Sequence, residues 1–124
     1  MKRKIIIPIY GVVLWIVITG EDDLAKERDK MNKVFGDSEL DDYDGLVSWN
    51  EYKFGIFLTC DATHRTIAHE VFHLAHRILD YRHADYDVEY DEPAAYLCGY
   101  LTDLVYGVID QNGQAKNITQ KDKK

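Results

Sequence analysis

The chain has 124 residues, 46% of them hydrophobic, and its 22 acidic side chains outnumber its 15 basic ones to give a net charge of −7. This length suits one compact domain with an apolar core, and it excludes two full domains or wholesale disorder. The acidic balance argues against a nucleic-acid partner, because phosphate contact needs clustered Lys and Arg. Cys60 and Cys98 are too few and too far apart in sequence for a zinc knuckle or a disulfide scaffold, and we expect free thiols.

The first apolar run, residues 5–20, follows three basic residues and therefore imitates a signal peptide or a membrane anchor. It is shorter than the roughly 20 residues that a spanning helix needs, and one Pro and one Gly interrupt it. Ile, Val and Thr dominate the run, which favours strands. We therefore predict two strands, over about residues 4–9 and 12–19, that turn at Tyr10 and Gly11, and we expect no membrane segment.

A helix and two further strands are predicted next. The helix covers residues 21–35, because acidic residues open it and Gly36 closes it. Its inward-facing residues would be Leu24, Met31, Val34 and Phe35. A polar loop follows over residues 37–45, and its acids lack the spacing of a calcium loop. Residues 46–50 and 52–60 are then predicted to form strands.

The C-terminal half contains two more predicted helices. Residues 61–66 include cap-type side chains, and a helix then runs to about Tyr81. An acidic loop with tyrosines spans residues 82–91, and the second helix covers about residues 92–108, with a proline in its first turn. From Asp110 onward the chain is polar, which predicts a frayed end.

These elements predict an α+β fold of one domain over residues 1–109, with a polar tail over residues 110–124. The expected architecture is a small mixed or antiparallel sheet with an N-terminal hairpin and one helix after it. A motif-bearing helix and a C-terminal helix complete the domain. Trp15 and Trp49 are expected in the core.

All five histidines lie between His64 and His83. Two of them, His69 and His73, form a His-Glu-x-x-His motif with Glu70. Residues four apart share one helix face, so both imidazoles can bind one ion, and zinc accepts neutral imidazole nitrogen. Glu70 is offset by about 100°, beside the ion, where it can take a proton from a water molecule that the ion activates. An apolar stripe on the opposite face consists of Ile67, Val71, Leu74 and Ile78.

A catalytic zinc site needs three protein ligands and one open position, so a third ligand must come from elsewhere. His76 lies on nearly the same face but too far along the helix to share an ion easily with His69. Leu79 stands where a His-x-x-x-His-x-x-Gly-x-x-His motif would have its third ligand, which excludes that class. Glu92 is the preferred candidate, because it opens the next helix after a loop long enough to fold back. Its rivals are Asp91, His83 and Asp85.

The motif and the Glu-Pro-Ala-Ala-Tyr segment that starts at Glu92 together resemble gluzincin-type zinc metallopeptidases. The chain is also similar to small metallopeptidase-like proteins of tailed phages, which combine a Pro-Ile-Tyr-Gly-like hairpin with a Glu-x-x-Ala-Tyr-Leu segment. The resemblance implies a minimal zincin-like fold with one Zn²⁺ ion on His69, His73 and Glu92, and Glu70 as catalytic base. It implies a peptide or protein substrate, and a place in the cytoplasm of a host cell or on a virion.

Larger members of that family supply a His or Tyr from a downstream domain to stabilise the tetrahedral intermediate. Here a local donor would have to serve, and removal of such a donor typically costs about a hundredfold or more in rate. The candidates for this role or for a supporting role at the metal are His76, His83, Arg82, Tyr96 and Tyr100.

Two functional hypotheses follow. The first is zinc-dependent peptide-bond hydrolysis with Glu70 as general base. The second is a non-catalytic, zinc-stabilised binding or structural module, in which a fourth protein ligand closes the site. Under the first, the acidic surface would favour basic or neutral peptides, and an extended substrate could pair with residues 52–60 if that strand lies at the sheet edge. The oligomeric state is left open.

Overall fold

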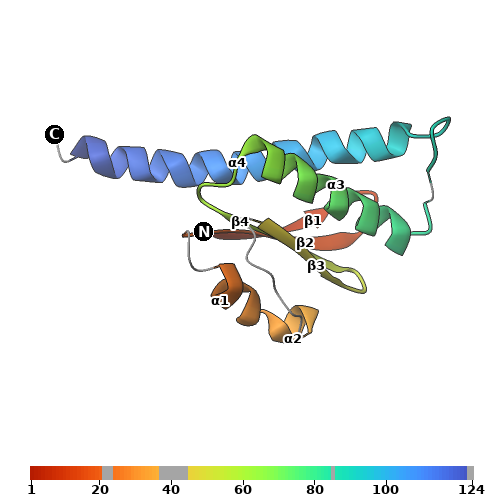
Figure 1. Cartoon of the computed structure of the whole chain (residues 1–124), viewed down its shortest axis with the longest axis horizontal. Coiled ribbons are helices and arrows are strands. Elements are labelled where there is room, and N and C mark those ends of the chain that lie inside the picture. Colours follow the sequence, from red (N-terminus) through yellow and green to blue (C-terminus); the bar gives the residue numbers. More distant parts are fainter. Residues whose placement is uncertain (21–23, 37–44, 85, 123–124) are drawn as a thin grey trace.

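The protein is an α+β domain in which helices cover both faces of a four-stranded sheet, as the sequence predicts. The computed structural model describes residues 1–20, 24–36, 45–84 and 86–122, with side chains up to residue 111. The elements in chain order are β1 (Lys2–Ile7), β2 (Val12–Thr19), α1 (Leu24–Asp29), α2 (Asn32–Phe35), β3 (Gly45–Asn50), β4 (Lys53–Thr59), α3 (His64–Tyr81) and α4 (Glu92–Asp122). Helices α3 and α4 lie on one face of the sheet, and α1 and α2 lie on the other (Figure 1).

The strand order is β1-β2-β4-β3, so β1 and β3 are the two edges. Strands β1 and β2 are antiparallel, β2 and β4 are parallel, and β4 and β3 are antiparallel. The possible edge position of residues 52–60 is therefore wrong, since β4 lies inside the sheet. The physical reason is the burial of this strand. All residues of β4 after Lys53 are buried, as expected for a strand covered on both faces. Strand β3 is the edge that runs beside α3.

The N-terminal hairpin forms as predicted, with β2 at the predicted bounds and β1 two residues earlier than expected. Strand β1 ends at Ile7 because Pro8 has no N–H group with which to continue the ladder. The turn includes Ile9 and Gly11, both with positive φ, at 71° and 62°. Arg82 fastens this turn to the end of α3 by donating from Nε to the Tyr10 carbonyl oxygen at 2.6 Å. Within the described ranges, no helix is long and apolar enough to cross a membrane.

The single helix predicted over residues 21–35 is instead two short helices; residues 21–23 lie outside the described part. The chain bends between α1 and α2 around the guanidinium group of Arg28, which is only 2% exposed. Arg28 donates from Nε to Ser48 Oγ at 2.6 Å and from Nη2 to the Gly36 carbonyl at 2.8 Å. A buried charge needs such partners, and the bend brings them within reach. Gly36 ends α2 with a φ of 77°, as the sequence predicts.

The apolar side chains of this segment face the sheet as predicted. Leu24, Met31 and Phe35 are buried with residues of β2 and β4, and Val34 packs at the margin of the same cluster. Trp15 lies half-buried beside it, with its ring edge-on to Phe35. This second, smaller core closes the face of the sheet opposite α3.

Helix α3 ends at Tyr81 as predicted, and it begins at His64, inside the segment 61–66 that was expected to precede it. Thr63 caps it, because its side-chain oxygen accepts a hydrogen bond from the Thr66 backbone N–H at 3.2 Å. The four residues of the predicted apolar stripe are all buried against the sheet and α4, and they fix the rotation of the helix about its axis. The two cysteines are half-buried free thiols, as expected.

Helix α4 is longer than predicted. The sequence suggests an end near Val108 and a frayed tail over residues 110–124, whereas the helix continues to Asp122. Among the residues whose side chains are described, Ile109 is the last one of α4 that packs on the main core. Helical hydrogen bonding needs no apolar face, however, and no proline follows Pro93 to interrupt it. Backbone hydrogen bonding therefore continues the helix beyond the residues whose periodicity predicted it.

Candidate metal centre on helix α3

The His-Glu-x-x-His motif lies on the face of α3 that points away from the core. His69 and His73 are exposed, and their Nε2 atoms are 3.1 Å apart with ring planes at 76°. Two imidazoles on one tetrahedral zinc ion, each at about 2.0–2.1 Å, would have nitrogens about 3.3–3.4 Å apart. The two side chains are thus arranged closely enough to act as two ligands of one ion.

Glu70 lies beside this pair and is more enclosed than either histidine. Its Oε1 atom is 4.0 Å from His69 Nε2, and the side chain is 12% exposed. Burial raises the pKa of the Glu70 carboxyl above its usual value, and the charges of His69 and His73 oppose that rise. A carboxylate with a raised pKa is a better proton acceptor at neutral pH, so its position and its electrostatics both suit a general base.

The motif opens onto a groove between α3 and the edge strand β3, with a volume of about 550 Å³. The strand contributes one wall, and the exposed face of α3 contributes the other. The lining residues are Gly45, Leu46, Val47, Trp49, His69, Glu70, His73 and Arg77. Strand β3 is an edge strand among the described residues, and it lines the groove together with the candidate metal ligands.

Gly45, at the start of β3, makes room for Glu70. A Cβ atom at this position would lie 3.0 Å from Glu70 Cγ, 2.9 Å from Leu58 Cδ2 and 3.1 Å from Thr66 Cγ2. These are closer than ordinary contacts, and Leu58 is fully buried, so it has little freedom to move. The absence of a side chain at residue 45 therefore sets where the Glu70 carboxylate can lie.

We expect Gly45→Ala to destabilise the fold by about 1–3 kcal/mol, the usual cost of overpacking, and to displace Glu70. Denaturant unfolding measures the first effect. The matched control is Gly99→Ala on α4, where nothing lies within 4 Å of the added carbon. Alanine there should be neutral or stabilising by up to about 1 kcal/mol, because it favours the helix. Equal stability of the two variants would contradict the close packing around Glu70.

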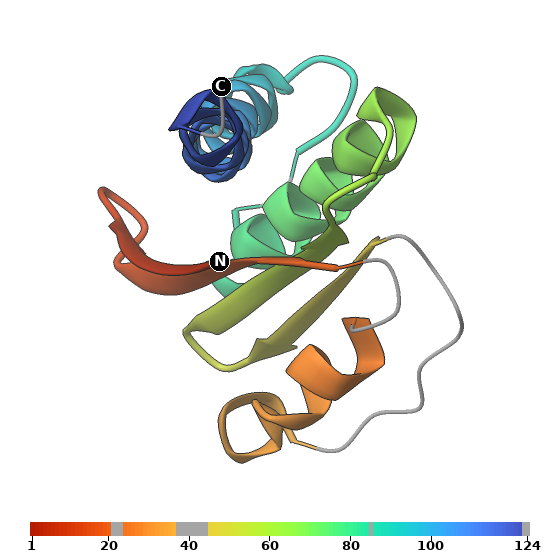
Figure 2. The same ribbon diagram turned by 90° about the vertical axis from the view of Figure 1, so that its left-hand side faces the viewer.

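The third ligand predicted from the sequence is not brought to the groove. Glu92 is exposed at the start of α4, and it is not among the groove residues. Helix α4 lies over the β1–β2 side of the sheet, whereas α3 lies toward β3 (Figure 2). Asp91 and His83 are also exposed outside the groove, and Asp85 lies outside the described residues. In the described ranges, no three His, Cys, Asp or Glu side chains are grouped to hold a metal ion.

Two of the other three histidines contact tyrosine hydroxyl groups. The His76 ring lies 3.2 Å, through Nδ1, from the Tyr86 hydroxyl and so joins α3 to the loop that follows it. His64 contacts the Tyr106 hydroxyl through Nδ1 and joins the start of α3 to α4. His83 lies in the turn after α3 with a φ of 56°. None of the three lines the groove.

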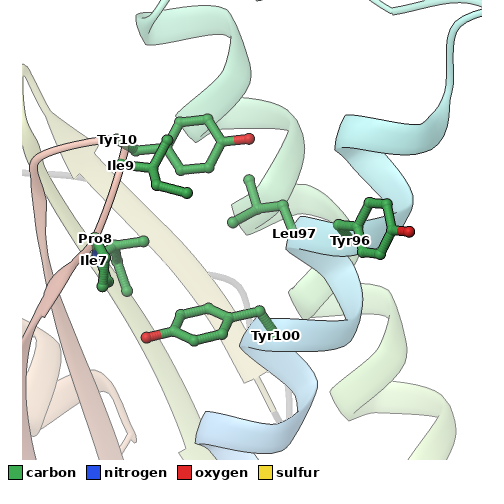
Figure 3. Close-up of a pocket in the computed structure, with 7 residues that line it drawn as sticks. All are labelled: Ile7, Pro8, Ile9, Tyr10, Tyr96, Leu97 and Tyr100. Carbon is green, nitrogen blue, oxygen red and sulfur yellow. The ribbon is translucent and has the colours of Figure 1, made fainter.

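The tyrosines considered as oxyanion donors belong to a different cavity. Figure 3 shows Tyr100 of α4 extending toward the β1–β2 turn across a pocket of about 380 Å³, which Tyr96 also lines. Its remaining lining residues are Ile7, Pro8, Ile9, Tyr10 and Leu97. Arg82, the other candidate, is engaged with the carbonyl groups of the same turn. The structure therefore separates these side chains from the motif.

The sequence analysis did not assign Gly45, Trp49 or Arg77 to the site, although all three line the groove. Trp49 is 45% exposed at the end of β3, so its expected place in the core is wrong. Arg77 covers one face of its ring, with Cζ 4.1 Å from the ring centroid. Arg77 follows His73 by one helical turn, so its spacing alone could have placed it on the motif face. Gly45 gave no signal, because its role depends on a contact across the fold.

Comparison of the chain with protein-family models, with curated proteins and with solved structures finds no match. No activity can therefore be inferred from a similar protein. The functional argument rests on the residues that line the groove and on the chemistry they can perform.

Proposed function

We propose that the protein is a metal-dependent peptidase whose active site is the groove between α3 and β3. The observation that carries the proposal is the convergence of two imidazole nitrogens, 3.1 Å apart, with a partly enclosed carboxylate beside them. A divalent ion such as zinc, when bound there, polarises the scissile carbonyl and makes the attacking water more acidic. His69 and His73 would hold this ion, and Glu92 is retained from the sequence as the proposed third ligand.

Glu70 has the role of proton carrier. Its carboxylate accepts a proton from the attacking water and later donates it to the nitrogen of the leaving amine. The Glu70 side chain lies beside Gly45 and is only 12% exposed, so its motion is restricted and less entropy is lost in positioning it for the reaction. The enclosure that raises the Glu70 pKa also helps it to hold the proton until the nitrogen of the leaving amine accepts it.

The substrate class follows from the open strand beside the motif. Among the described strands, β3 pairs with β4 alone, so its other edge can exchange backbone hydrogen bonds with an extended peptide. Such pairing recognises the peptide backbone and would hold a scissile bond beside Glu70. A groove of about 550 Å³ accommodates a few residues of peptide rather than a folded domain.

The direct test is incubation of the zinc-supplemented protein with a mixed-sequence peptide library, with products identified by mass spectrometry. We expect cleavage at internal peptide bonds, loss of cleavage with a chelator, and recovery when zinc is returned. The chelated protein serves as its own control. Absence of new peptide termini across the library under all three conditions would contradict the proposal.

A further inference from the structure

Arg77 and Trp49 form a cationic end of the groove. Arg77 is half-buried on α3, one turn beyond His73, and its guanidinium group lies over the Trp49 ring of β3. Both side chains line the same groove as the motif. An aromatic ring attracts the charge of a guanidinium group that lies over its face, which favours one position of the side chain. The side chain is thus held in place across the groove from helix to strand.

The stacked guanidinium group has no acidic partner among the described side chains, where neither ion pair involves Arg77. This is unusual in a chain with a net charge of −7, in which acids outnumber bases. Stacking occupies the face of the guanidinium group and leaves the N–H groups at its rim available. Those donors match the two oxygens of a carboxylate.

We propose that Arg77, supported by Trp49, binds a carboxylate group of the substrate, an inference that rests on the peptidase function proposed above. Glu70 and Arg77 are seven positions apart, about 10 Å along the helix axis. This span corresponds to about three residues of extended peptide. The subsite therefore selects a negative charge a few residues from the scissile bond, although the net charge of the chain suggested basic or neutral substrates.

The carboxylate can come from an acidic side chain or from the C-terminus of the peptide. Gly45 lies beside Glu70 and Trp49 beside Arg77, so β3 runs from the motif toward the cationic end. A peptide antiparallel to β3 would place Arg77 on the N-terminal side of the scissile bond, where only a side chain can supply the charge. A parallel peptide would place Arg77 on the C-terminal side, within reach of a terminal carboxylate.

The test measures binding by calorimetry with the Glu70→Gln protein in the presence of zinc, so that bound peptide is not cleaved. The probes are alanine-based, N-acetylated hexapeptides. One set carries a single Glu, or Gln in its place, at successive positions and ends in an amide; the other is all-alanine, as free acid or amide. We expect the preferred carboxylate peptide to bind at least tenfold more tightly than its neutral counterpart, and this preference to disappear in Arg77→Gln.

Arg65→Gln, at an exposed position near the start of the same helix, is the matched control and should keep the preference. Arg77→Glu provides a second test, since it should reverse the preference toward a peptide with Lys at the same position. If Arg77→Gln retains the carboxylate preference of the unchanged protein, or that protein shows none, the subsite proposal is overturned even where library peptides are cleaved. The carboxylate preference could instead be lost in Arg77→Gln while the protein cleaves no library peptide. That result would support the subsite proposal and contradict the peptidase proposal.

Discussion

Replacement of Glu70 by Gln is expected to lower kcat/KM for peptide cleavage by at least a hundredfold while the fold and the metal remain. Glutamine keeps the shape of the side chain and its contact with Gly45, but it cannot take a proton from water. General-base catalysis by a positioned side chain typically contributes about 10²–10⁴-fold, so its removal should dominate the kinetics. The assay is product formation from the best library peptide with zinc in excess.

The control for this variant is Glu89→Gln, because Glu89 is an exposed acid in the loop after α3. It changes the net charge by the same amount without touching the groove, so its kcat/KM should match that of the unchanged protein. Metal analysis of both variants separates lost catalysis from lost metal. Full activity in a pure Glu70→Gln preparation would show that this carboxylate is not the base.

Loss of metal is the expected result of His73→Ala. Removal of one of two converging imidazoles takes away a ligand that the rest of the groove does not replace, and activity should fall with metal content. The fold should persist, because His73 is exposed and makes no core contact. Metal content after dialysis, measured by elemental analysis, gives the result directly.

His64→Ala is the matched control for this experiment. His64 is a histidine on the same helix whose ring contacts Tyr106 rather than the groove, so its removal should leave one equivalent of metal bound. Retention of a full equivalent of metal by His73→Ala would refute the ligand assignment. Glu92→Gln in the same assay tests the third ligand: metal loss there would mean that the first turn of α4 approaches the histidine pair when metal is bound.

The parts of the fold that the sequence predicts best are those set by local periodicity. The apolar stripe of α3, the cap at Thr63 and the Ile- and Val-rich strand β2 all depend on residues close together in the chain. The bend between α1 and α2 could not be predicted this way. It depends on Ser48, a residue of another element that accepts a hydrogen bond from Arg28. Strand order has the same origin, because burial on both faces of β4 arises only once the helices are in place.

The candidate site was likewise predictable only where it depends on local spacing. The motif was readable because His69, Glu70 and His73 share one helix face by spacing alone. The groove depends on β3 lying beside α3, so the roles of Gly45 and Trp49 emerge only from the packing of the two elements. The role of Glu92 as a ligand stays a prediction from its sequence context, and α4 packs on the side of α3 away from β3.

The central claim is that α3 and its neighbours hold one metal ion with a position left open for chemistry. It is tested most directly by the metal stoichiometry and coordination of the purified, zinc-supplemented protein, measured by elemental analysis and X-ray absorption at the zinc edge. The account predicts one equivalent of zinc with two imidazole ligands, one carboxylate ligand and an open fourth position. A protein that retains no zinc, or one whose ion is closed by four protein ligands, would contradict it.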